Sequence, residues 1–172
     1  MTNDSTKTTS MVLSEGVVIR LAREQDLEQI IALNRAALPE NYMLEFFANL
    51  LRVYGDYFIV AEMDGRTIGY TMCRIELGMT HLSSSPFGIM KKGHIVSLAV
   101  DREQRRHGIA LAMMEETLRR MRDVGLKECF LEVRETNEPA IKLYEKLGFK
   151  IVRRVSGYYS DGTDGYIMSI AL

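Results

Sequence analysis

Apolar residues recur every three or four positions in four stretches of the chain, which is the spacing of an amphipathic helix. These stretches cover residues 27–38, 43–54, 108–124 and 137–147. Residues that stop helices follow the first two, namely Pro39 and the pair Gly55-Asp56. The last stretch opens with Asn137, which can cap a helix, and is followed by Gly148, which can end one. The pattern therefore predicts four helices.

Seven other stretches are rich in β-branched and aromatic residues and predict strands. They cover residues 17–21, 57–63, 67–75, 94–100, 129–133, 149–155 and 166–171. Asp64-Gly65, between the second and the third, is a strong hairpin signal. The stretch 94–100 is almost continuously apolar, as expected of a strand buried on both faces. Residues 77–92 contain Gly, Ser and Pro without a clear period and predict a long loop.

This order of helices and strands predicts a mixed α/β sheet with helices on its faces. Neither an internal repeat nor a linker interrupts residues 15–172, so we expect a single domain there. Residues 1–14 are polar and predict a flexible tail. The length of 172 residues agrees with roughly one domain.

Composition and charge exclude several classes of protein. The 22 basic and 23 acidic residues give a formal net charge of −1, so the chain is not built to coat nucleic acid. The sequence has no apolar run as long as the roughly 18 residues of a membrane span. Residues 1–15 lack the apolar centre of a signal peptide. We therefore expect a cytoplasmic protein that binds neither nucleic acid nor a membrane.

The cysteines and histidines do not have the spacing of a metal site. Cys73 and Cys129 have no Cys or His neighbour at ligand spacing, and His81, His94 and His107 form no pair four residues apart. We interpret the two cysteines as small buried apolar residues and expect no bound metal.

A segment that can bind an anion lies between a predicted buried strand and a predicted helix. It reads Arg105-Arg106-His107-Gly108-Ile109-Ala110. The start of a helix exposes unpaired N–H groups, and Gly108 lets a phosphate approach the backbone closely. The segment is neither a Walker loop nor a dinucleotide fingerprint. Taken alone, it also fits an exposed basic turn.

Two segments resemble the signature motifs of the GCN5-related N-acetyltransferase (GNAT) family. Residues 105–110 resemble its R/Q-x-x-G-x-G/A motif, and residues 137–149 resemble its N-x-x-A-x-x-L-Y-x-x-x-G-F segment. The resemblance covers about residues 17–171. It implies a GNAT fold, in which a mixed central sheet of about seven strands, with about four helices, splays apart between strands four and five. It also implies acetyl-coenzyme A as the cofactor.

Three further segments resemble the N-terminal acetyltransferase branch of that family, which includes the NatA catalytic subunit, its archaeal counterparts and bacterial RimI. They are 38–42 (LPENY), 93–100 (GHIVSLAV) and 157–166 (GYYSDGTDGY), in which Gly165 replaces the usual Ala. This resemblance implies acetylation of protein or peptide N-termini that begin with Ser, Ala or Thr, and of some that begin with Met. Nascent chains at the ribosome are then one source of substrate, and no auxiliary subunit is required.

Two alternative functions stay open at this point. A lysine, polyamine or small-amine acetyltransferase would have the same fold, since fold does not determine substrate. A regulatory module that binds acetyl-coenzyme A without catalysis is the other, and the presence of candidate acid and base residues argues against it.

The resemblance assigns one group of residues to the coenzyme. The 105–110 segment holds the pyrophosphate, backbone N–H groups near Leu98 polarise the thioester carbonyl, and Tyr144 faces the sulfur as a general acid. From spacing alone, Tyr144 also fits an aromatic core residue. The complete group is Leu98, Ala99, Val100, Arg105, Arg106, His107, Gly108, Ile109, Ala110, Asn137 and Tyr144.

His94 and Glu132 are the candidate bases. At pH 7 roughly one α-amine in ten is neutral, so a modest base suffices for N-terminal substrates. An imidazole titrates near neutrality when unperturbed, and a carboxylate at the end of a strand can act through a water. A structural histidine and an ion-paired carboxylate are the alternative interpretations.

Glu40, Tyr42, Tyr158 and Tyr159 are the candidates for peptide binding. They lie in the loop between the first two helices and in the loop before the last strand. A tyrosine can pack its ring on a peptide and hydrogen-bond the peptide backbone. Alternatively, Glu40 caps the second helix, and the two later tyrosines belong to an ordinary surface turn.

Overall fold

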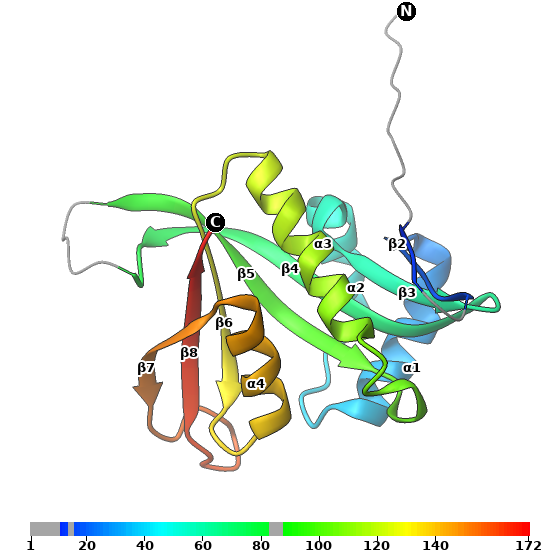
Figure 1. Cartoon of the computed structure of the whole chain (residues 1–172). Coiled ribbons are helices and arrows are strands. Elements are labelled where there is room, and N and C mark those ends of the chain that lie inside the picture. The colour runs from blue at the N-terminus through cyan, green and yellow to red at the C-terminus, as the bar shows by residue number, and fades with distance from the viewer. Residues whose placement is uncertain (1–10, 14–15, 83–87) are drawn as a thin grey trace, which may run out of the picture.

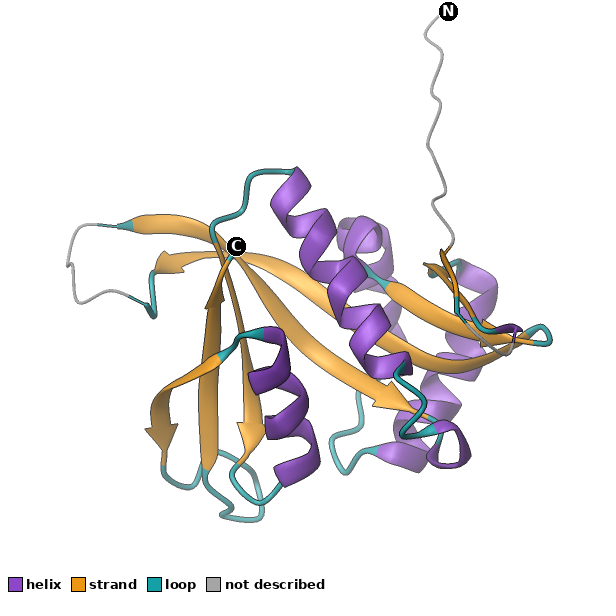
Figure 2. Cartoon of the chain, viewed as in Figure 1, coloured by secondary structure: helices purple, strands orange, loops and turns teal. Residues whose placement is uncertain are grey.

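The computed structural model describes residues 11–13, 16–82 and 88–172. The strands are β1 (Met11–Val12), β2 (Val18–Leu21), β3 (Ile59–Met63), β4 (Arg66–Met79), β5 (Ile89–Val100), β6 (Glu128–Arg134), β7 (Lys150–Val155) and β8 (Gly165–Ala171). The helices are α1 (Leu27–Ala37), α2 (Leu44–Tyr54), α3 (Ile109–Asp123) and α4 (Glu138–Leu147). The strands form one sheet in the order β1-β2-β3-β4-β5-β6-β8-β7. α3 and α4 cover one face of this sheet, and α1 and α2 cover the other (Figures 1 and 2).

The four predicted helices and the seven predicted strands are confirmed, with shifted ends. α1 ends at Ala37 because a residue that precedes a proline, here Leu38, is disfavoured in helical conformation. At α4, the Asn137 side chain accepts a hydrogen bond of 3.3 Å from the N–H of Ala140, and Gly148 ends the helix at a φ of +99°. Both ends of α4 are therefore fixed by the residues that the sequence indicated.

The loop predicted over residues 77–92 is wrong at both ends. β4 continues to Met79 and β5 begins at Ile89, so the two strands extend as a hairpin in which Leu77 pairs with Lys91. Leu77 and Ile89 are 72% and 74% exposed. Because neither side chain is buried, the sequence here does not alternate between apolar buried and polar exposed positions, and so it does not predict a strand. The central part of the predicted loop, residues 83–87, lies outside the described residues.

Two other predicted boundaries also differ from the structure. The expected tail over residues 1–14 is wrong for Met11–Val12, which pair with Val18 and Ile19 at the edge of the sheet. The strand expected from Tyr57 begins instead at Ile59, because Gly55–Tyr57 form a 3₁₀ turn after α2. Residues 1–10, 14 and 15 of the expected tail lie outside the residues that the structure describes.

β5 and β6 are parallel and separate soon after they meet. They pair only where Gly93, His94 and Ile95 face Cys129, Phe130 and Leu131. Beyond these pairs β5 continues along β4, while β6 continues along β8, and the two strands diverge in Figure 1. They are the fourth and fifth of the predicted strands, so the splay expected between them is confirmed.

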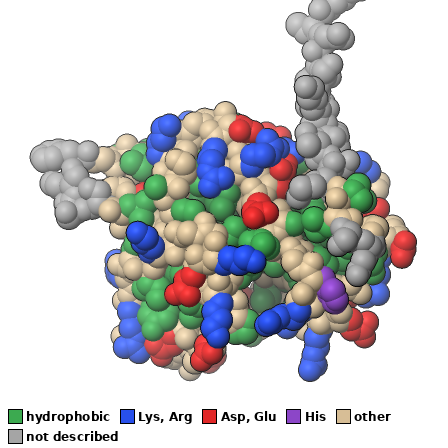
Figure 3. Space-filling view, viewed as in Figure 1, with side chains coloured by type: hydrophobic (Ala, Val, Ile, Leu, Met, Phe, Trp, Pro, Cys, Tyr) green, Lys and Arg blue, Asp and Glu red, His purple; other side chains and the backbone are tan. Residues whose placement is uncertain are grey.

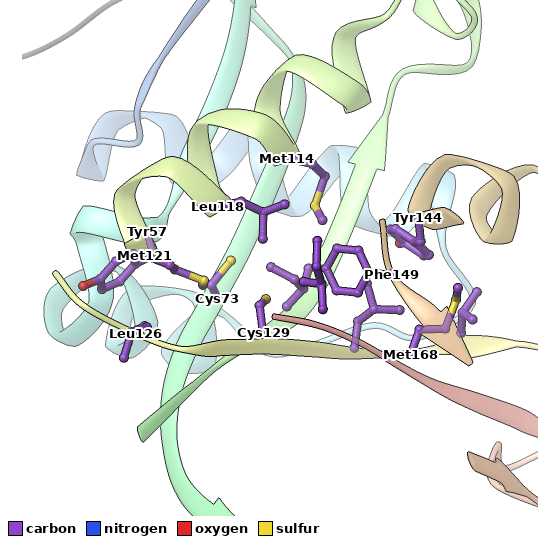
Figure 4. Close-up of a cluster of buried hydrophobic side chains, with 14 residues drawn as sticks. Tyr57, Cys73, Met114, Leu118, Met121, Leu126, Cys129, Tyr144, Phe149 and Met168 are labelled. Carbon is purple, nitrogen blue, oxygen red and sulfur yellow. The ribbon is translucent and has the colours of Figure 1, made fainter. Parts of the chain in front are cut away.

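A core cluster beneath α3 and α4 holds the sheet together next to this splay (Figure 4). Met114, Leu118 and Met121 of α3 contribute to it and are at most 2% exposed. Cys73 and Cys129 are buried in the same cluster as free thiols, and burial raises the pKa of both. The prediction that the cysteines are apolar core residues is therefore confirmed.

A buried ion cluster fixes the start of α1 to the sheet. The Arg20 guanidinium donates two hydrogen bonds, of 2.7 and 2.8 Å, to the carboxylate of Asp26 and also pairs with Glu62. Burial favours the neutral form of Asp26. The hydrogen bonds from Arg20 and from the N–H of Arg23 outweigh it, so the net effect is a lowered pKa. α1 leads directly into the loop that contains Glu40, so this cluster also positions part of the site.

Among the described residues, none of the helices is both long and apolar enough to cross a lipid bilayer.

We expect Arg20→Met to lower the free energy of unfolding by about 3–5 kcal/mol, because it leaves a buried carboxylate without its cation. Because the pKa of Asp26 is lowered in the folded state, this stabilisation is fully present above the ordinary carboxyl pKa and is lost as the pH falls from there through the lowered pKa. Urea unfolding at pH 7 and at pH 3 measures both effects.

Arg66→Met is the matched control, since Arg66 is exposed and pairs with Asp101 at the surface. Its expected cost is about 0–1 kcal/mol. If both variants lowered the free energy of unfolding by the same amount, the buried cluster would not stabilise the fold more than a surface ion pair does.

Candidate functional site

A cavity of about 590 Å³ lies where β5 and β6 diverge. Its walls come from β5, β6, α4, the α1–α2 loop and the β7–β8 loop. Figure 3 shows the surface hollowed between α4 and the N-terminal end of α3, with Lys and Arg side chains near the rim. Nine of the predicted site residues line the cavity: Glu40, Tyr42, His94, Leu98, Glu132, Asn137, Tyr144, Tyr158 and Tyr159.

The structure brings the two candidate bases into direct contact. The Nε2 atom of His94 lies 2.6 Å from an Oε atom of Glu132. The Nδ1 atom of His94 lies 2.8 Å from Glu76, which pairs in turn with Arg74. Phe130, opposite His94 on β6, stacks on the imidazole with a centroid distance of 4.3 Å and an interplanar angle of 10°. Hydrogen bonds at both ring nitrogens and the stacked Phe130 ring on one face therefore fix the imidazole of His94 in place.

Glu76 is a site residue that sequence reasoning missed. Burial favours its neutral form, but the hydrogen bond with His94 and the charges of His94 and Arg74 outweigh burial, so the pKa of Glu76 is lowered. In the sequence, Glu76 is recognisable only as a carboxylate next to the end of a predicted strand. Only the structure shows the pairing of β4 with β5 that brings Glu76 beside His94.

Tyr158, in the β7–β8 loop, lies close to Glu132. Burial, followed by the negative charge of Glu132, raises the pKa of the Tyr158 phenol to about 12. A Cβ atom on Gly165 would lie 3.2 Å from the Cβ atom of Tyr158. The Gly that replaces the usual Ala therefore gives Tyr158 room to pack against β8.

Tyr144 is both a core residue and a cavity residue. It is 8% exposed, packs against Phe149 at a centroid distance of 5.9 Å and lines the cavity from α4. Burial raises the pKa of its phenol. Its hydroxyl therefore keeps a proton that it can donate. The interpretation as an aromatic core residue is confirmed, and the role as a general acid stays a prediction that this position allows.

Arg134 joins the two loops that carry the peptide-binding candidates. Its Nη atoms lie 2.5 Å from Glu40 and 2.7 Å from Asp161, and its guanidinium lies 4.1 Å above the ring of Tyr159. We call these four residues the loop clasp. Sequence reasoning missed Arg134, although it follows Glu132 by two positions and so shares a strand face with it.

The loop clasp also decides the role of Glu40. Met43, not Glu40, is the N-cap residue of α2, and α2 has no side-chain cap. The alternative in which Glu40 caps α2 is therefore wrong. Tyr42 stacks on Phe46 at 4.8 Å, so its ring is fixed to α2 while it lines the cavity.

The predicted anion segment lies at the start of α3, and none of its residues lines the cavity. Arg106 and Gly108 have positive φ angles of 71° and 76°, which turn the chain sharply into the helix. Arg105 donates a hydrogen bond of 3.1 Å to the carbonyl of Val100 and so ties this turn to the end of β5. The first turn of α3 contains no acidic residue. An anion would therefore meet backbone N–H groups at the positive end of the helix dipole.

Several predicted coenzyme residues can contribute only through the backbone. The side chains of Ala99, Val100 and Ile109 are buried in the core, and that of Ala110 packs beside it. By contrast, Arg106 and His107 are exposed. The edge of β5 after Ile95 has no pairing with β6, so backbone donors and acceptors there face the splay.

In the part of the chain that the structure describes, His, Cys, Asp and Glu side chains do not gather in groups of three as they would around a metal ion.

Comparison with known proteins identifies relatives over most of this chain. The chain is 48% identical over 155 residues to an N-alpha-acetyltransferase of Sulfurisphaera tokodaii, which covers 90% of this chain and 92% of the relative. The crystal structure of Ard1 from Thermoplasma volcanium is 27% identical, has a TM-score of 0.79 and covers 91% of this chain and 98% of that one.

A third relative was solved with a ligand that combines coenzyme and peptide. It is Arabidopsis thaliana Naa50 in complex with the bisubstrate analogue CoA-Ac-MVNAL, 26% identical, with a TM-score of 0.77 and coverage of 91% of this chain and 99% of that one. The resemblance to archaeal N-terminal acetyltransferases seen in the sequence is thus confirmed.

The profile of the Acetyltransferase (GNAT) family matches residues 19–149. This span includes β5, the anion segment, α3 and α4, the elements that carry the predicted coenzyme residues. The chain belongs to the acetyltransferase (GNAT) family, and acetyl-coenzyme A is its acetyl donor.

Proposed function

We propose that this protein transfers acetyl from acetyl-coenzyme A to the N-terminal α-amino group of proteins, with preference for chains that begin with Ser, Ala or Thr and acceptance of some that begin with Met. The observation that carries this proposal is the joined pair His94 and Glu132 at the splay, beside two loops held together by Arg134. The high identity to an archaeal N-alpha-acetyltransferase supports it.

The reaction follows from the groups around the splay. The neutral α-amine attacks the thioester carbonyl, an N–C bond forms, and the C–S bond breaks as the tetrahedral intermediate collapses. The amine loses a proton to the His94–Glu132 pair, and the leaving thiolate takes a proton from Tyr144. Free N–H groups on the open edge of β5 stabilise the charge that develops on the carbonyl oxygen; such donors are worth about 3–4 kcal/mol.

The loops on the other side of the cavity suit a peptide end. Tyr42, Tyr158 and Tyr159 present rings and hydroxyls to the cavity, and Glu40 is held at its edge by Arg134. A peptide backbone can pack on the rings and hydrogen-bond to the hydroxyls. A free α-amine also needs less help than a lysine, because at pH 7 roughly one α-amine in ten is neutral, against about one lysine in 2,500.

The same proposal extends to the setting in which the protein works. We propose that the protein acts without an auxiliary subunit, because ion pairs within this chain, from Arg134 to Glu40 and Asp161, already join the two peptide loops. The two free thiols agree with a reducing cytoplasm. N-termini of chains under synthesis at the ribosome are a source of substrate there.

Gly108→Glu tests the coenzyme side. A carboxylate at the start of α3 repels the pyrophosphate, so we expect the KM for acetyl-coenzyme A to rise by at least about tenfold. Gly108→Ala is the matched control, because it adds the same strain at a φ of +76° without the charge, and a Cβ there meets no atom within 4 Å. If the Glu and Ala variants bind the coenzyme equally well, the phosphate site lies elsewhere.

Arg134→Met tests the peptide side. Methionine keeps the apolar stem but removes the ion pairs with Glu40 and Asp161, so the two loops lose their link. We expect the KM for peptide to rise about five- to tenfold, while the KM for acetyl-coenzyme A stays unchanged. Arg153→Met, an exposed change on β7, is the control. A rise confined to the coenzyme KM would contradict the assignment of these loops to the peptide.

A panel of acceptors tests the proposed substrate class. The purified full chain is incubated at pH 7 with acetyl-coenzyme A and peptides that begin with Ser, Ala, Thr or Met, with an N-blocked lysine peptide and with a polyamine, and products are identified by mass spectrometry. We expect the lysine peptide to react roughly 100-fold or more slowly than the Ser peptide, because its amine is about 2.4–2.7 pKa units more basic.

The pH dependence provides a second criterion for the panel. Between pH 7 and 9 the lysine rate should keep rising, while the α-amine rate levels off near the α-amine's pKa of about 8. Equal rates on lysine and free N-terminus at pH 7 would overturn the N-terminal proposal and leave the acetyltransferase activity in place.

A further inference from the structure

The hydrogen bonds around His94 constrain its protonation. Both ring nitrogens face carboxylate oxygens, Nδ1 at 2.8 Å from Glu76 and Nε2 at 2.6 Å from Glu132. An ionised carboxylate only accepts hydrogen bonds, whereas a neutral imidazole has one N–H donor. Two ionised partners are therefore satisfied together only if the imidazole carries both N–H protons and is a cation.

The alternative is a neutral imidazole beside one protonated carboxyl group. Glu76 does not fit that role, because Arg74 pairs with the same carboxylate, and a neighbouring cation favours the ionised form. For Glu132, the question is whether the proton between its carboxylate and Nε2 of His94 belongs to the carboxyl group or to the imidazole. Imidazole is a stronger base than carboxylate, so the shared proton belongs on the imidazole.

The charges around His94 form an alternating row. Arg74 is positive, Glu76 negative, the imidazolium positive and Glu132 negative, and each contacts the next. Such a row lowers the energy of every charge in it, since each lies beside the opposite sign. Both ends of the row line the cavity, Arg74 at one end and Glu132, beside Tyr158, at the other.

The other charged and titratable groups near His94 are arranged around Phe130 and the cavity. Lys92 of β5 lies 4.6 Å from the centroid of the Phe130 ring and donates to the carbonyl of Met79. His81, after β4, packs on Phe130 at 4.8 Å. From the loops, Tyr158 and Tyr42 face Glu132 as neutral phenols. The carboxylates of Glu76 and Glu132 alone hydrogen-bond the imidazole among the described residues.

We propose that Glu76 is a positioning residue that holds His94 as an imidazolium, so that Glu132, and not His94, accepts the proton of the attacking amine. The inference rests on the proposed function, in which the amine is an N-terminal one. In the proposed step the N–H bond of the amine breaks, its proton moves to Glu132 directly or through a water, and the positive His94 keeps Glu132 in place and ionised until then.

The first test reads the protonation of His94 without using activity. In the full chain labelled with ¹⁵N-histidine, two-bond ¹H–¹⁵N spectra report which ring nitrogens carry protons, and His94→Gln identifies the His94 signals. We expect both nitrogens of His94 to be protonated at pH 7.5. In Glu76→Gln, which removes the negative charge beside Nδ1, a smaller fraction of His94 should carry both protons at the same pH, since a neighbouring opposite charge favours the charged form.

Glu135→Gln is the matched control for loss of a negative charge near the site. Glu135 follows β6, pairs with Arg154 and does not line the cavity. It should leave the titration of His94 unchanged. A wild-type His94 that is neutral at pH 7, or a Glu76→Gln variant that titrates like wild type, would overturn the proposal.

The second test separates the two carboxylates by kinetics. Glu132→Gln should lower kcat by about 100-fold or more, in the range of general-base catalysis. We expect a smaller loss, about tenfold, from Glu76→Gln and from His94→Gln, with unchanged KM for acetyl-coenzyme A. The reverse order, in which His94→Gln costs more than Glu132→Gln, would make His94 the proton acceptor. Since the spectra do not depend on turnover, a failed substrate assignment and a failed role of Glu76 give different results.

Discussion

The early end of the pairing between β5 and β6 determines the rest of the site. Three residue pairs hold these strands together, from Gly93 with Cys129 to Ile95 with Leu131. Parallel strands normally continue to pair inside a covered sheet. Here β5 follows β4 and β6 follows β8, which leaves an edge of β5 free inside the fold. The free edge costs backbone hydrogen bonds that a bound coenzyme can replace.

The residues proposed to be catalytic lie at the level where the pairing ends. His94 and Phe130 face each other in the middle pair, and Glu132 is the first residue of β6 beyond the last one. The buried cluster under α3 and α4 fixes the paired part of both strands. A rigid junction therefore supports groups that must keep distances of less than 3 Å, while the loops supply the more variable peptide side.

Much of this arrangement was predictable from local patterns. Helix spacing, the Asn137 cap and the Gly148 end located α4, and the motif around Gly108 located the start of α3. Contacts between distant strands were not predictable in the same way. Glu76 and Arg134 act through partners 18 and 94 residues away, Glu76 on His94 and Arg134 on Glu40. The extended β4–β5 hairpin was missed because exposed Leu77 and Ile89 carry no burial pattern.

The loop clasp has a consequence for how a positive chain end travels into the site. Arg134 carries one positive charge beside the two carboxylates of Glu40 and Asp161, so the loop clasp keeps a net negative charge at the edge of the cavity. Inside the cavity, Glu132 contacts His94, and in the proposed arrangement the imidazolium offsets its charge. The edge of the cavity thus attracts the positive chain end, while the paired charges inside favour the neutral amine that attacks.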